Sequence, residues 1–82
     1  MESEKALLPV TQLKEGESGT IWEIAGGLNA VRRLEALGIR QGKSLKKLGG
    51  MYLRGPVVVQ VGHTKISIGH GMASKIVVEV RR

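Results

Sequence analysis

Cysteine and aspartate are absent from this chain of 82 residues, and each absence excludes a kind of site. Without cysteine there is no disulfide, no thiolate nucleophile and no cysteine-ligated zinc or iron–sulfur centre. Without aspartate the side-chain carboxylates are seven glutamates, which excludes a dedicated calcium loop. Phenylalanine is absent too, and only Trp22 and Tyr52 supply aromatic rings.

Long apolar runs are also missing, since the longest are three residues, such as Val57–Val59. A membrane-spanning helix needs roughly 20 apolar residues, so none is expected. No apolar segment typical of a signal peptide follows the first five residues, MESEK. We therefore expect a cytoplasmic protein with no direct membrane insertion.

Basic residues and glycine are abundant. The chain has 13 Lys and Arg against 7 Glu, for a net charge of +6, which suits a nucleic acid, an acidic protein or an anionic membrane surface. Twelve glycines indicate many tight turns between short strands. The length allows one domain, residues 1–82, of which we expect 1–8 to be loosely ordered.

The first clear element is a strand over residues 18–25. Thr20, Trp22 and Ile24 would share one face of it, with Ile21 on the other. This pattern predicts a strand that is partly buried on both faces or that carries a β-bulge. We expect Trp22 to lie in the core.

Residues 28–37 have apolar positions at helical spacing and predict a short amphipathic helix. Gly38 follows as the expected left-handed residue of a Schellman ending, with Leu34 and Ile39 as its apolar contact. From there on the pattern is that of β structure. Strands are expected at 44–48, 57–61, 65–68 and 76–80, with a tight turn at Gly62-His63 and a turn or helical link through Ser74. The predicted fold class is mainly β: a small five-stranded barrel with one helix inserted after its first strand.

Catalysis is not expected, because the residue types that it needs are missing. No G-x-S-x-G motif is present, and no cysteine or aspartate could complete a catalytic triad. We predict that the protein is not an enzyme.

His63 and His70 are weak candidates for a metal site, with Glu79 as a conceivable third ligand. Their seven-residue spacing matches no common zinc pattern, which favours two exposed turn histidines. We expect no cofactor, and at most weak or adventitious binding of a divalent metal.

A basic cluster follows the helix and favours attraction to phosphates. It comprises Arg40, Lys43, Lys46 and Lys47, which Arg54, Lys65 and Lys75 could join. Single-stranded nucleic acid also needs aromatic stacking platforms, and few rings are available. A solvated basic face is the preferred interpretation, and a free-standing nucleic-acid-binding barrel is kept as an alternative.

Met51, Tyr52 and Leu53 form an apolar tip between Gly49-Gly50 and Gly55-Pro56. Such a tip either folds back to cap the barrel or contacts a partner. Met51, Tyr52, Leu53 and Arg54 are therefore the first candidates for partner binding, with Arg32 and Arg33 of the helix second. Residues 76–80 could form an edge strand, which would allow homo-oligomers.

The segments LKEGESGTIWEIAGG, RRLEALGIRQGKSLKKL and GPVVVQVGHTKISIGHGMASKIVVEV, in this order, resemble the FeoA family over Leu13–Val80. Among the most specific pieces are Gly19, Gly42 and Gly55-Pro56. The resemblance implies an SH3-like barrel with a helix after its first strand. It also implies a non-catalytic role in ferrous iron transport through contact with the membrane transporter FeoB.

The same resemblance leaves a weak Fe(II)-binding carrier as a further alternative. The chain departs from the family pattern at Lys47, where an apolar residue is usual, and this predicts either a bulge or a lysine that extends from the rim of the barrel. His70 stands where arginine is frequent in the family.

Overall fold

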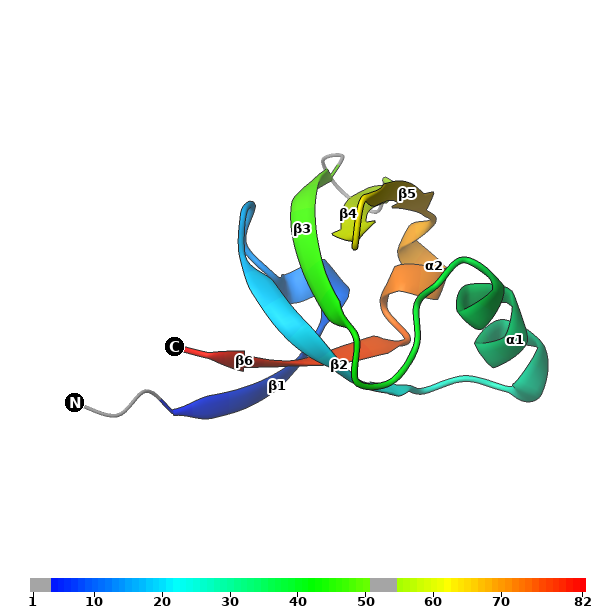
Figure 1. Cartoon of the computed structure of the whole chain (residues 1–82), viewed down its shortest axis with the longest axis horizontal. Helices are drawn as coiled ribbons and strands as arrows, with labels where there is room; N and C mark the ends of the chain where they lie inside the picture. The colour runs from blue at the N-terminus through cyan, green and yellow to red at the C-terminus, as the bar shows by residue number, and fades with distance from the viewer. Residues whose placement is uncertain (1–3, 51–54) are drawn as a thin grey trace.

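A single antiparallel sheet of six strands forms the frame of the computed structural model, which describes residues 4–50 and 55–82. The strand order is β1-β6-β2-β3-β4-β5, and the sheet curves strongly so that β4 and β5 lie above α2 (Figure 1). The strands are β1 Lys5–Pro9, β2 Ser18–Ile24, β3 Ser44–Gly50, β4 Val57–Val61, β5 Thr64–Ile68 and β6 Ile76–Arg81. The helical segments are η1 Val10–Gln12, α1 Leu28–Ala36 and α2 His70–Ala73.

The predicted mainly β architecture with one short helix after the strand at 18–24 is confirmed. The sheet has six strands in place of the predicted five, and the helix follows the second, because β1 was not expected. The α1 helix ends as expected: the N–H of Gly38, at φ 90°, donates to Glu35 O and that of Ile39 to Leu34 O. Leu34 and Ile39 are both buried, which gives the Schellman ending its apolar contact. No helix within residues 4–50 and 55–82 is long and apolar enough to cross a membrane.

Among the described residues, fourteen buried apolar side chains on the inner face of the sheet, the helices and the connecting segments form one core. Alternation along the strands supplies most of it, because successive strand side chains point to opposite faces. Val57 and Val59 in β4, Ile66 and Ile68 in β5, and Ile76, Val78 and Val80 in β6 all point inward, as predicted.

The N-terminal strand β1 differs from the expected loose ordering of residues 1–8. Residues 5–9 pair with β6, and Glu4 exchanges both backbone hydrogen bonds with Arg82, at 3.2 and 3.1 Å. Ladder hydrogen bonds alternate along antiparallel strands. The backbone N–H and C=O groups of Ala6 and Leu8 therefore point toward β6, while the backbone nitrogen of Pro9 points away from it. Pro9 has no N–H to donate, and this is a position where none is needed.

The last strand, β6, was expected to offer a free edge for self-association, and this prediction was wrong. It lies between β1 and β2 and pairs with both. The free edges of the sheet belong to β1 and β5.

Two register shifts bend the sheet. In β2 the shift lies between Ile21 and Glu23, which leaves Trp22 as the extra residue of the predicted bulge. The expected burial of Trp22 was wrong, because its side chain is 47% exposed. A second shift, between Lys47 and Gly49, bulges β3.

Lys47 forms hydrogen bonds at the position where the family resemblance leads one to expect an apolar residue. Its part-buried Nζ donates to Leu13 O at 2.7 Å and to Thr11 O at 3.2 Å. The lysine thereby satisfies two carbonyls of the segment between β1 and β2. Of the two alternatives expected from the sequence, the bulge is present, whereas Lys47 turns inward instead of extending from the rim.

Arg82, at the end of β6, also binds the segment between β1 and β2. Arg82 donates from Nε and Nη2 to the two carboxylate oxygens of Glu17, at 3.1 and 2.9 Å. These bonds, and the backbone N–H of Lys14, lower the pKa of Glu17 from its ordinary value of 4.5 to about 2. The segment between β1 and β2 is thus held both to β3 and to the end of β6.

We expect the substitution Lys47→Met to lower the free energy of unfolding by about 1–3 kcal/mol, because two carbonyls would lose a charged donor. Urea denaturation measures the difference. Lys46→Met serves as the control, since Lys46 is exposed on the same strand, and should change stability by less than about 0.5 kcal/mol. Equal effects of the two substitutions would contradict the role given to Lys47.

We expect the stabilisation from Glu17 to depend on pH in the acidic range. Folding lowers the pKa of Glu17, so its contribution is fully present above about pH 4.5 and is lost as the pH falls towards 2. In Glu17→Gln this part of the pH dependence of unfolding should disappear. An NMR titration that placed the pKa of the Glu17 carboxyl near 4.5 in the folded protein would contradict the ion pair.

Candidate functional site

The partner-binding residues predicted from the sequence fall into two groups. Met51, Tyr52, Leu53 and Arg54 lie outside the described residues, so that hypothesis stays a prediction. Arg32 and Arg33 are exposed on α1. This helix lies at the end of the molecule opposite the two chain ends (Figure 1).

The two histidines are not brought together. His63 lies in the turn before β5 and His70 in α2 after it, so the whole of β5 separates them. A strand of five residues spans about 17 Å at the usual rise per residue. In the part of the chain that the structure describes, no three His, Cys, Asp or Glu side chains group as metal ligands.

The basic cluster predicted after the helix is brought together only in part, because Lys46 and Lys65 share one face of the sheet across Gln60. Arg40 and Lys43 line a groove beside the β4–β5 turn. Lys47 turns inward to the carbonyls of Thr11 and Leu13, and Lys46 is exposed farther along β3. The described residues therefore give no continuous track of cations along β3.

The outer face of the sheet carries an apolar patch that the sequence did not predict. Residues opposite one another in register share a face, so Pro9 and Leu7 of β1 lie on the face that carries Val77 of β6. Val77 also faces the bulge of β2, where Trp22 is inserted. Leu7 is 50% exposed and Trp22 47%. We call Leu7, Pro9, Trp22 and Val77 the outer patch.

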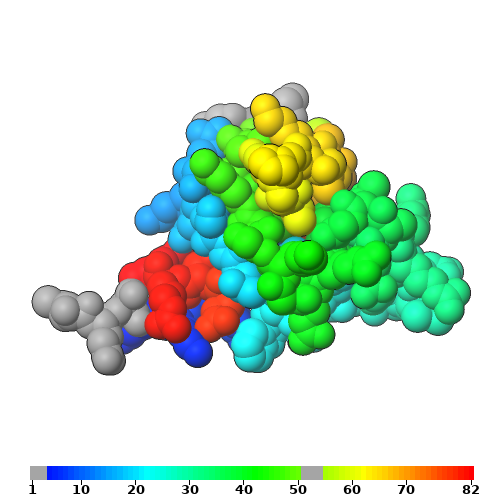
Figure 2. All heavy atoms as spheres, viewed as in Figure 1, coloured from blue at the N-terminus to red at the C-terminus, as the bar shows by residue number. Residues whose placement is uncertain are grey.

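Charged and hydroxyl side chains border the outer patch. Lys5 stands opposite Arg81, and its Nζ lies 3.3 Å from an oxygen of Glu79. Figure 2 shows that β1 (blue), β6 (red and orange) and part of β2 (cyan) meet at the surface along the lower side of the molecule. The border carries both signs of charge, because Glu79 lies opposite Leu7 and Glu23 opposite Val77, while Lys46 of β3 faces outward opposite Ser18.

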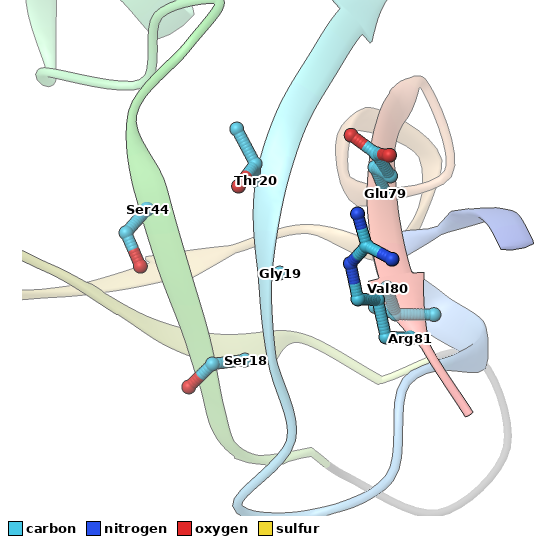
Figure 3. A pocket seen from close by; sticks show the side chains of 7 residues that line it. All are labelled: Ser18, Gly19, Thr20, Ser44, Glu79, Val80 and Arg81. Carbon is cyan, nitrogen blue, oxygen red and sulfur yellow. The ribbon is translucent and has the colours of Figure 1, made fainter. Parts of the chain in front are cut away.

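A polar notch opens beside the patch where the pairing of β2 with β6 ends (Figure 3). Their pairing ends at Thr20 and Glu79, so Ser18 and Arg81 are left on either side of the opening. Gly19 lies at this point, and a Cβ there would come within 2.7 Å of Glu79 O and 2.8 Å of Val80 Cγ1. The close approach of β6 therefore needs glycine at position 19.

Chemically, this surface suits binding. Trp and Arg side chains are among the commonest contributors to protein–protein affinity, and they lie near the centre of an interface within a ring of contacts that excludes water. An apolar centre with a polar rim is the usual anatomy of such interfaces. The notch adds hydroxyl groups and backbone groups for hydrogen bonds.

The sequence did contain one signal for the outer patch. The pattern allowed a bulge in β2, and a bulge turns one more side chain out of the strict alternation. We nevertheless expected Trp22 to lie in the core, because a lone tryptophan is usually buried. Leu7 was missed because residues 1–8 were not expected to form a strand.

Comparisons with known proteins agree with this fold. A family model described as the FeoA domain matches residues 8–80. The candidate Fe(2+) transport protein A of Methanocaldococcus jannaschii is 37% identical over 73 residues, which cover 89% of this chain and 87% of that protein.

Two solved structures extend the comparison. A crystal structure of the iron uptake regulatory protein FeoA has a TM-score of 0.84 at 27% identity, covering 94% of this chain and 100% of that one. The zinc complex of FeoA from Stenotrophomonas maltophilia, a prokaryotic SH3 domain protein, has a TM-score of 0.71 at 26% identity, covering 84% and 86%. A family match over residues 8–80 and this relative at 37% identity show that the chain belongs to the FeoA family.

Proposed function

We propose that this FeoA-family chain is a cytoplasmic, non-catalytic accessory protein of ferrous iron transport that binds a FeoB-type membrane transporter. Membership of the family supports the transport role. The relative from Methanocaldococcus jannaschii carries the name Fe(2+) transport protein A, and the Stenotrophomonas protein has been put forward as a ferrous iron transport activating factor.

The observation that carries the proposal of direct contact is the exposed Trp22 in the outer patch. A tryptophan held outside the core by a bulge exposes a large apolar area. The cations Lys5 and Arg81, which lie at the other end of the patch from Trp22, would help to orient an approaching partner. We therefore assign the transporter contact to the outer patch and its border.

The proposed contact needs no resident metal or cofactor. An Fe(II) carrier that used His63 and His70 gains no support from their places before and after β5. A free-standing nucleic-acid barrel gains little from the basic residues, because Lys47 turns inward and few aromatic rings are available for stacking. Iron is the cargo of the transporter in this proposal.

We expect Trp22→Ala to weaken binding to the purified transporter in lipid nanodiscs at least tenfold, because truncating an interface tryptophan typically costs about 2 kcal/mol or more. Biolayer interferometry with the full-length transporter and with its isolated GTP-binding domain measures the effect and locates the contact.

Leu37→Ala is the matched control. Leu37 is 50% exposed, close to the value of Trp22, but it follows α1 instead of lying on the outer face. Its substitution should change the affinity less than twofold. Equal binding by wild-type protein and Trp22→Ala would refute the assignment of the outer patch, and no binding by wild-type protein would refute the transporter contact itself.

A further inference from the structure

A second surface lies between the α1–β3 connection and the β4–β5 turn, and it shares Ser44 with the notch beside the outer patch. One wall consists of residues around Arg40 and Lys43, and the other of the turn that carries His63. These two segments are about 20 residues apart in sequence and form the two sides of one open groove. The groove is lined by Gly38, Arg40, Lys43, Ser44, Val61, Gly62, His63 and Thr64.

The lining of this groove has one sign of charge. Arg40 and Lys43 are cationic, and none of the described residues that line the groove is acidic. Hydroxyl groups of Ser44 and Thr64 stand beside them. The ion pairs found within residues 4–50 and 55–82 join Lys5 to Glu79 and Arg82 to Glu17, so the positive charge of the groove is not neutralised by these residues.

Both walls are held by hydrogen bonds. Arg40 Nε donates to Glu35 O at 3.3 Å at the C-terminal end of α1. The peptide around Lys43 is fixed to β2, because Ile21 N–H donates to Lys43 O and Gly42 N–H to Ile21 O, both at 2.8 Å. A ligand would therefore meet cations whose backbone is already ordered, which lowers the entropy lost on binding.

The opposite wall is equally constrained. Gly62 has a φ of 61°, a value that suits glycine, in the two-residue turn between Val61 and Thr64. Gln60 Nε2 donates to Gly62 O at 3.1 Å and fixes the turn from below. The width of the groove is thus set by two structured segments.

We propose that this groove binds an acidic segment of a protein partner, with glutamate or aspartate carboxylates at Arg40 and Lys43. We choose an acidic segment as the ligand on the basis of charge complementarity, because cations and hydroxyl groups are the groups that bind carboxylates. Nucleic acid is disfavoured because, among the described residues, no Trp, Tyr or Phe lines the groove to stack on a base. The proposal stands apart from the outer patch, so either can fail without the other.

A fluorescein-labelled peptide of eight glutamates tests the proposal by fluorescence anisotropy at 50 mM salt. We expect the peptide to bind the wild-type protein, and Lys43→Glu to weaken binding at least fivefold. In NMR spectra, the amides of Gly38, Ser44 and Thr64 should shift on addition of the peptide.

Lys14→Glu is the matched control, because it makes the same change in net charge at an exposed lysine next to the far end of β3. It should weaken binding less than twofold, and thermal unfolding should show that both variants remain folded. Equal weakening by the two substitutions would mean that only net charge matters and would overturn the proposal. So would absence of binding to wild-type protein, or tighter binding of a 12-residue thymidine oligonucleotide with the same sensitivity to Lys43→Glu.

Discussion

The pairing of β6 with both β1 and β2 is the constraint on which the rest of the structure depends. It buries Val78 and Val80 against the core and brings the two ends of the chain together at Glu4 and Arg82. It also requires glycine at position 19, where β6 passes too close for any side chain. Once β6 is in place, Arg82 can reach Glu17 and hold the segment that connects β1 to β2.

The inner and outer faces of the sheet have different roles because β6 pairs with both β1 and β2. The inner face is continuous and apolar, and it accounts for stability. The outer face is broken by the bulge at Trp22 and by the end of the pairing between β2 and β6, and these two irregularities expose the groups proposed for contact. Natural sheets often place bulges beside functional surfaces for this reason.

Much of the fold could be predicted from the sequence, because alternation and turn residues are local signals. The valines of β4, the turn at Gly62 and the Schellman ending at Gly38 were all predicted and all confirmed. Strand order is not local, so the interior place of β6 was missed, and with it the strand at residues 5–9. The exposure of Trp22 was missed because a bulge changes which face receives a side chain.

Pro9 has a consequence for how copies of this protein behave at high concentration. The exposed edge of β1 is a template to which another strand could add, and such addition is a common route to aggregation. Pro9 interrupts that template, since its nitrogen has no hydrogen to offer to an incoming chain. The edge available for pairing with another strand is thereby shortened to the residues from Lys5 to Leu8. In a second copy that pairs in parallel register, Lys5 would lie opposite Lys5, and the two positive charges would repel.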